Sequence, residues 1–231
     1  MRNLSHLAWL LLLSAFATCA HAADVIDRIA AMVNGHVILQ SDWDDAVRFE
    51  AFAEGRPLDQ VTDQDRGHAL DRLIDQELLR EQAQGAESQP PSAEELQPRI
   101  LEIQKQQAAT APADWQSALS RYALDQKQVE AWLARDISML HQVEARLRPA
   151  VQVTPQGVEA YYRDTFLPQL RKTGAQEVPL AQVSGQIREI LTQQKVNELF
   201  ASWLQSLRAE SKISMPVPAS SPPASTGGQA P

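Results

Sequence analysis

The sequence predicts a mainly α-helical protein with a small β-hairpin near its N-terminus and a long helix near its C-terminus. The hairpin is indicated by Asn34-Gly35, which separates two short apolar runs, because both central residues of a type I′ turn need a positive φ. The helices are indicated by abundant Ala, Leu, Gln, Glu and Arg and by apolar residues at helical spacing up to about residue 213. A hairpin alone is marginal in water, so we expect the helices to cover it.

The hairpin runs directly into the first expected helix. Ser41 is the expected N-cap of a helix over about residues 42–53, and Asp42 lies in its first turn, where the helix dipole favours negative charge. At the other end of the chain, residues 212–215 have room for one short strand that would complete the hairpin as a small sheet. The apolar residues of the hairpin are Ile26, Ile29, Met32 and Val33 before the turn and Val37, Ile38 and Leu39 after it.

Capping and breaking residues divide the middle of the chain into further helices. Ser, Thr and Asp are expected at the helix starts, because their side chains satisfy free backbone N–H groups, and Gly or Pro at the helix ends. The expected helices are one over about 63–84 stopped by Gly85, one from the capping box Ser92–Glu95 through Ile103, a short one capped by Asp114, a long one capped by Asp125 up to about residue 148, and one from Thr154-Pro155 through Phe166 that is ended by Pro168 and Gly174.

The last expected helix, over about residues 180–208, carries apolar residues on two different sides. A helix with two opposed apolar faces can be buried against two different bodies, which is the arrangement that we favour. The alternative is a kink that turns both halves toward one core. One side holds Leu180, Val183, Ile187, Ile190 and Leu191 at about 100° per residue, and roughly the opposite side holds Val196, Leu199, Phe200, Trp203, Leu204 and Leu207.

The first 22 residues have the pattern of a cleaved secretory signal peptide. Arg2 precedes an apolar stretch over residues 7–16 that is too short to span a bilayer, and Ala20-His21-Ala22 is the expected cleavage site. A lipoprotein signal at Cys19 is the alternative, and the residues before it fit that motif poorly. Cleavage after Ala22 removes the only cysteine, so the mature chain is expected to have no disulfide, thiol nucleophile or cysteine-based zinc site.

The mature chain is acidic. Removing residues 1–22 removes one positive charge and no acidic residue, so the net charge changes from −8 to −9. This balance disfavours nucleic acid and anionic membranes as partners, and no membrane span is expected in the mature protein. The expected divisions are 23–153 for the hairpin and its helices, 154–213 for a helical extension and the returning C-terminal helix, and 214–231 for an uncharged tail, rich in Pro, Ser, Ala and Gly, that is expected to be disordered.

No motif in the sequence indicates a catalytic, cofactor or metal site. The run Asp42-Trp43-Asp44-Asp45 is explained by its place in a first helical turn better than by a metal site. His36, His68 and His141 lie far apart in the sequence, and His141 is expected to pair with Glu144 one helical turn away. The sequence contains no H-E-x-x-H, nucleophile-elbow, P-loop or dinucleotide-binding motif. We therefore expect no enzyme activity, no metal and no cofactor.

Apolar and aromatic side chains are the remaining functional candidates, because exposed apolar patches mark binding sites. Residues in a helical stripe usually belong to the core, and each candidate is weighed against that role. Met139 lies at the edge of its stripe, and Tyr161 and Tyr162 cannot both face inward, which makes these three the stronger candidates. The residues expected to contact an unfolded client are Trp115, Met139, Tyr161, Tyr162 and Phe166.

Several segments resemble one known family. Residues 26–29 (IDRI), 32–42 (MVNGHVILQSD), 69–79, 122–153 and 183–213 resemble, in this order, segments of the SurA/PpiD-type periplasmic chaperones. The resemblance implies a hairpin that leads into a helical N-terminal domain and a C-terminal helix that packs back on it. One departure matters most. The family carries parvulin-type prolyl isomerase domains, whereas residues 148–179 are only 32 residues, fewer than the roughly 40 that a chain usually needs to fold alone.

The resemblance therefore implies the chaperone core without the isomerase. The expected function is an ATP-independent periplasmic holdase whose partners are unfolded outer-membrane or secreted proteins. Two alternatives remain open. One is an envelope scaffold that holds a single folded partner, and the other is a residual peptidyl-prolyl isomerase, for which residues 148–179 leave little room.

Overall fold

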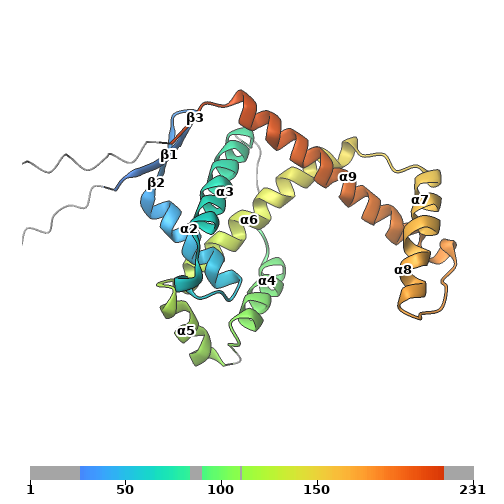
Figure 1. Ribbon diagram of the computed structural model, residues 1–231, viewed down its shortest axis with the longest axis horizontal. Helices are drawn as coiled ribbons and strands as arrows, with labels where there is room; N and C mark the ends of the chain where they lie inside the picture. Colours follow the sequence, from blue (N-terminus) through green and yellow to red (C-terminus); the bar gives the residue numbers. More distant parts are fainter. Residues whose placement is uncertain (1–26, 84–89, 110, 216–231) are drawn as a thin grey trace, which may run out of the picture.

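The computed structural model describes residues 27–83, 90–109 and 111–215. A small antiparallel sheet lies beside the N-terminal helices, and the long C-terminal helix leads away from it to a second group of helices (Figure 1). Strand β1 (Ile29–Val33) lies in the middle, between β2 (His36–Leu39) and β3 (Ile213–Ser214). The β1–β2 turn has the positive φ angles expected of the Asn-Gly pair, 50° at Asn34 and 95° at Gly35. The predicted fold class, mainly helical with a small N-terminal sheet and a long C-terminal helix, is confirmed.

Strand β3 brings the two ends of the described chain together. Met32 pairs with Ser214 and Val33 pairs with Ile213, which confirms the third strand expected in residues 212–215. The disordered tail was expected to start at Ser214, and this start is wrong because Ser214 belongs to β3. Residues 216–231 lie outside the described part of the chain, as do the expected signal peptide over residues 1–22 and Gly85.

Helix α2 (Gln40–Ala53) starts where β2 ends, and the predicted N-cap at Ser41 is wrong. Leu39 occupies the cap position, and its backbone N–H donates to the Asp42 carboxylate at 3.1 Å. Ser41 already lies inside the helix, where its hydroxyl donates to Asp27. The reason is that the strand enters the helix without a loop, so an aspartate of the first turn serves the free backbone N–H groups in place of the serine.

The remaining helices of the N-terminal part begin close to their predicted positions, with one exception. The predicted cap Asp114 is wrong: Ala111 is the cap residue, and its N–H donates to the Asp114 carboxylate at 3.0 Å. Pro112 starts this helix because a first-turn residue needs no backbone N–H. The helices, each with its cap residue, are η2 (Leu58–Gln60, Pro57), α3 (Asp63–Gln82, Thr62), α4 (Ala93–Gln106, Ser92), α5 (Pro112–Arg121, Ala111) and α6 (Gln126–Leu147, Asp125).

The two larger of three apolar clusters among the described residues of this part form its main cores. In the first, formed by α2, α4, α5 and α6, the ring of Phe52 lies 5.3 Å from the rings of both Trp115 and Tyr122. The second joins the sheet, α3 and the C-terminal end of the long helix α9 (Leu180–Glu210), with Val33 and Leu207 buried in it. The returning C-terminal helix is thus part of the same core as the hairpin.

Helix α9 is buried against two bodies, as its two apolar faces predicted. Its N-terminal half packs through Val183 and Ile187 against α7 (Pro155–Tyr161) and the turn that follows it. Its C-terminal half packs through Phe200, Trp203 and Leu207 against the sheet and α3. Figure 1 shows α7 and α8 at the end of α9 that is far from the sheet. The helix is continuous over its length, so the alternative of one kinked helix facing one core is not adopted.

Residues 148–179 are helical over most of their length. A 3-10 turn (Arg148–Ala150) precedes α7, and a π-helical turn (Tyr162–Phe166) joins α7 to α8 (Leu167–Lys172). Pro168 was expected to end the preceding helix, and this is wrong. It lies in the first turn of α8, directly after the π-helical turn, where a residue without a backbone N–H is tolerated. Gly174, with φ of 70°, follows the end of α8 as expected.

Candidate functional site

A cavity of about 630 Å³ lies between strand β2 and helices α3 and α6, whose arrangement is visible in Figure 1. Its volume falls within the range of small-ligand pockets, about 300–1,000 Å³. All three elements contribute apolar side chains to it, and charged residues of α2, α3 and α6 lie among them. The apolar lining residues are Val37, Ile38, Leu73, Ala83, Trp132 and Met139, and the charged ones are Asp42, Glu77, Arg80 and Arg135.

A second cavity of about 220 Å³ lies between α3, α6 and α9. Met139 of α6 lines both cavities, so one flexible thioether side chain forms a wall that they share. The apolar surface here reaches solvent, since Leu140 is 48% exposed. The second cavity is lined by Leu79, Leu140, Val143, Val196 and Phe200 together with Asp136, Glu144, Gln193 and Asn197.

Strand β2 presents both an apolar side chain and a sheet edge to the first cavity. Val37 lines the cavity and is 45% exposed. In the sheet order β2-β1-β3, β2 is an outer strand. Among the described residues no further strand pairs with its other edge. Such an edge offers backbone N–H and C=O groups to a partner chain.

Trp132 forms a fixed part of the cavity wall. Its ring stacks on the ring of Phe49 with centroids 5.1 Å apart, and the guanidinium carbon of Arg135 lies 5.2 Å from its centroid. Both contacts restrict the tryptophan side chain, because stacking and cation–π interactions each favour one ring orientation. The wall therefore combines the restrained Trp132 with the flexible Met139.

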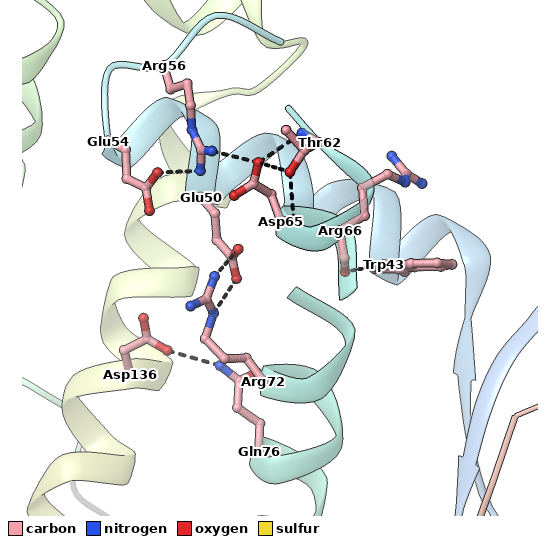
Figure 2. A network of polar contacts seen from close by, with 10 residues as sticks. All are labelled: Trp43, Glu50, Glu54, Arg56, Thr62, Asp65, Arg66, Arg72, Gln76 and Asp136. Carbon is pink, nitrogen blue, oxygen red and sulfur yellow. Dashed lines mark hydrogen bonds and ion pairs between the residues drawn. The ribbon is translucent and has the colours of Figure 1, made fainter. Parts of the chain in front are cut away.

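A polar network beside the cavities ties α2, α3 and α6 together (Figure 2). Arg72 of α3 pairs with Glu50 of α2, with the Arg72 Nε donor 2.5 Å from the carboxylate. Gln76 of α3 donates to Asp136 of α6 at 3.2 Å. Burial raises the pKa of Asp136, because loss of water disfavours its charged form. These contacts set the separation of the helices on which the cavities depend.

The same network includes the connection between α2 and α3 (Figure 2). Arg56 contacts the Asp65 carboxylate at 2.7 Å, and the Thr62 N–H donates to the same carboxylate at 2.8 Å. The bond from Arg56, followed by those from Thr62, holds the pKa of Asp65 well below its usual value of 3.8. The turn between the helices is therefore anchored by a charged group.

The structure does not bring the five predicted client residues together. Met139 alone among them lines the cavities described above. Trp115 is only 6% exposed and belongs to the first core. Tyr161, Tyr162 and Phe166 lie in the C-terminal part, against the core formed by α7 and α9. Client contact at each of these five residues stays a prediction.

The two tyrosines differ from the expectation about their orientation. Tyr161 and Tyr162 both pack partly against the same core, although neighbouring residues of a helix were not expected to face inward together. Tyr162 begins the π-helical turn. It stacks on Phe166 with ring centroids 5.8 Å apart and donates its hydroxyl to the Val178 carbonyl at 2.8 Å.

Sequence reasoning missed most of the cavity wall. Val37 was assigned to the hairpin, and nothing in the sequence places it or Leu73 beside Met139. This surface forms where α3 and α6 cross beside β2. A crossing between elements is a tertiary feature, and the sequence of each element alone does not show it.

Asp44 and Asp45 of the 42–45 run, and His141, form ion pairs with neighbouring side chains. Asp44 pairs with Arg66 at 2.5 Å, and Asp45 pairs with Arg48. The predicted pairing of His141 is wrong. Its Nε2 atom lies 2.9 Å from Glu95 of α4, whereas Glu144 contacts Arg148. Helix α4 lies close enough to α6 for Glu95 to reach His141. The positions of these two residues in the sequence do not reveal that they are neighbours.

No protein-family model matches this chain, and no curated protein sequence matches it either. Within residues 27–83, 90–109 and 111–215, every helix is too short or too polar to cross a bilayer.

Proposed function

We propose that this protein is an ATP-independent chaperone that holds unfolded polypeptides, and that the two cavities sharing Met139 form its client site. The observation that carries the proposal is an apolar surface, open to solvent at Val37 and Leu140, beside an outer strand. A holdase needs an apolar surface that adapts to many sequences. Methionine suits this role because its side chain is unbranched, flexible and polarizable.

Backbone hydrogen bonds would add to the apolar contacts. A client segment in extended conformation can pair with the outer edge of β2 and direct alternate side chains toward the cavity, as in β-strand addition. Val37 and Ile38, two successive residues of β2, both line the cavity, so the edge and the apolar surface are adjacent. This mode is independent of client sequence, since every chain offers the same backbone groups.

The proposed location is the periplasm, with outer-membrane or secreted proteins in transit as clients. The signal-peptide pattern of residues 1–22 and the resemblance to SurA/PpiD-type chaperones support it. The net charge of −9 expected once residues 1–22, with Arg2 as their only charge, are removed from the chain of net charge −8 favours solubility while apolar surface is exposed. No nucleotide-binding motif occurs in the sequence, and prolyl isomerisation is not part of the proposal.

The test uses the chain from Ala23 onward and an unfolded outer-membrane protein. We expect the chain to suppress aggregation of the client, measured by light scattering, and Met139→Glu to weaken this suppression. The reason is that a charge placed in the shared wall must stay hydrated and so opposes apolar contacts. A matched control is Leu101→Glu, because Leu101 is 54% exposed on α4 and lines neither cavity.

Three results would contradict the proposal. No suppression by the unmodified chain would favour a scaffold for one folded partner. Equal losses in Met139→Glu and Leu101→Glu would mean that general surface apolarity, not the cavities, acts on the client. Turnover in a proline-isomerisation assay on a short peptide would show an enzyme that the proposal does not include.

A further inference from the structure

Three potential metal ligands converge where the hairpin meets α3. His36 follows the β1–β2 turn, and Glu77 and Glu81 lie one helical turn apart on α3. One ligand atom of each residue lies within 4.8 Å of the others. The two glutamates share a helix face because residues at i and i+4 are neighbours. The histidine comes from a different element, so the cluster depends on tertiary structure.

We propose that His36, Glu77 and Glu81 form a binding site for a divalent transition-metal ion of the zinc class. Zinc bonds of about 2.0–2.2 Å to histidine nitrogen and carboxylate oxygen place tetrahedral ligand atoms about 3.3 Å apart. The His36 Nδ1 atom and the Glu77 Oε1 atom are already 3.5 Å apart. One imidazole with two carboxylates suits zinc, copper or nickel better than calcium or magnesium, which prefer oxygen ligands alone.

Neighbouring hydrogen bonds orient one of the carboxylates. The Asn34 side-chain amide donates to Glu81 Oε2 at 2.7 Å, and its carbonyl oxygen accepts from the Lys212 N–H at 2.8 Å. Such outer contacts fix the direction of a metal ligand and strengthen binding. Because Asn34 engages Oε2, the second oxygen of Glu81 is the one assigned to the ion. The proposed site thus connects β1–β2, α3 and the segment before β3.

Arg80 competes with an ion for this site. Its Nη2 atom lies 2.6 Å from Glu77 Oε1 and 3.3 Å from His36 Nδ1, so a positive group already occupies the position between these ligands. The Arg80 side chain is 52% exposed, and it can turn outward into water when an ion binds. Metal binding should therefore become tighter when Arg80 is replaced. If Arg80 and Glu77 formed only a surface ion pair and no metal site existed, this gain would not be expected.

The test is a calorimetric titration of the chain from Ala23 onward with zinc chloride, at a pH where histidine is neutral. We expect one equivalent to bind and to raise the thermal unfolding midpoint. His36→Ala and Glu81→Gln should each weaken binding by about tenfold or more, and Arg80→Met should strengthen it. His141→Ala is the matched control, since His141 is 2.9 Å from Glu95 but belongs to no three-ligand group among the described residues.

NMR spectra of the histidine rings give a second readout that does not depend on variants. Zinc should shift the His36 resonances and leave those of His68 and His141 in place. The proposal is overturned if no zinc binds, if His141→Ala weakens binding as much as His36→Ala, or if Arg80→Met weakens binding while the fold, checked by circular dichroism, is unchanged. The site does not depend on the proposed chaperone function, because client binding and zinc binding are measured separately.

Discussion

The carboxylate of Asp65 shows how far single residues follow from sequence. Its bonds from the Thr62 N–H and hydroxyl, at 2.8 and 2.7 Å, belong to the local cap of α3, which a Thr-x-x-Asp spacing indicates. Its contact with Arg56 at 2.7 Å is not indicated by that spacing, because Arg56 lies at the start of the connection between α2 and α3. That contact depends on the path of the chain through the turn.

Asp65 gives a pH-dependent prediction. Its pKa is lowered in the folded state, so its stabilising contribution is complete above the usual aspartate pKa of 3.8 and is lost as pH falls from there toward the lowered value. Asp65→Asn should therefore lower the free energy of unfolding at neutral pH, by an amount that shrinks steadily below about pH 4. Urea unfolding at several pH values measures this, with Asp59→Asn as a control from the neighbouring turn. A difference that is constant with pH would contradict the ion-pair explanation.

At the scale of elements, hydrophobic periodicity predicted which residues of a single helix are buried. It did not predict the structure where two elements meet. The opposed stripes of α9 follow from residue spacing alone, and both halves are buried as expected. The start of α2 did not follow, because the uninterrupted entry from β2 moves the cap to Leu39. The π-helical turn before Pro168 is also invisible to a 3.6-residue period. The cavity wall is a third case, since it needs the crossing of α3 and α6.

The two halves of α9 should respond differently to loss of packing. Ile187 is 1% exposed in the core with α7, and Leu207 is 8% exposed in the core with the sheet. Replacing either by alanine removes similar apolar volume, at a cost of about 2–5 kcal/mol in the local packing. We expect Ile187→Ala to speed amide exchange in α7 and the first half of α9, and Leu207→Ala to speed it in the sheet and α3. Identical exchange patterns in the two variants would show that α9 joins a single cooperative unit.

At the scale of the whole molecule, the sheet depends on both ends of the described chain. The hairpin and the last strand were each foreseen from local patterns. The sequence indicated that a third strand could join the hairpin, but not the register in which β3 pairs with β1. That register depends on how α9 returns along α3. The Asn34 N–H donates to the Lys212 carbonyl at 3.0 Å, and Arg208 of α9 contacts Asp75 of α3 at 2.5 Å. These contacts fix the strand against β1.

Removal of β3 should change the behaviour of the whole molecule. A chain that stops after Glu210 leaves one edge of β1 without its partner strand, and open edges promote association between chains. We expect this truncated chain to form oligomers in size-exclusion chromatography and to unfold at a lower temperature. A chain that stops after Met215 keeps β3 and serves as the control. If both truncations elute alike, β3 does not protect the edge.

The pairing of Asn34 with Lys212 also determines how late in synthesis the sheet can be completed. The two residues are separated by 178 positions, and at ribosomal rates of about 5–20 residues per second that interval lasts roughly 10–35 s. Throughout it, the hairpin is made while its third strand is not, and contacts of such long sequence separation form slowly. The nascent chain therefore passes through a period in which the edge of β1 is unguarded. During this period the proposed chaperone would itself be an incompletely folded chain.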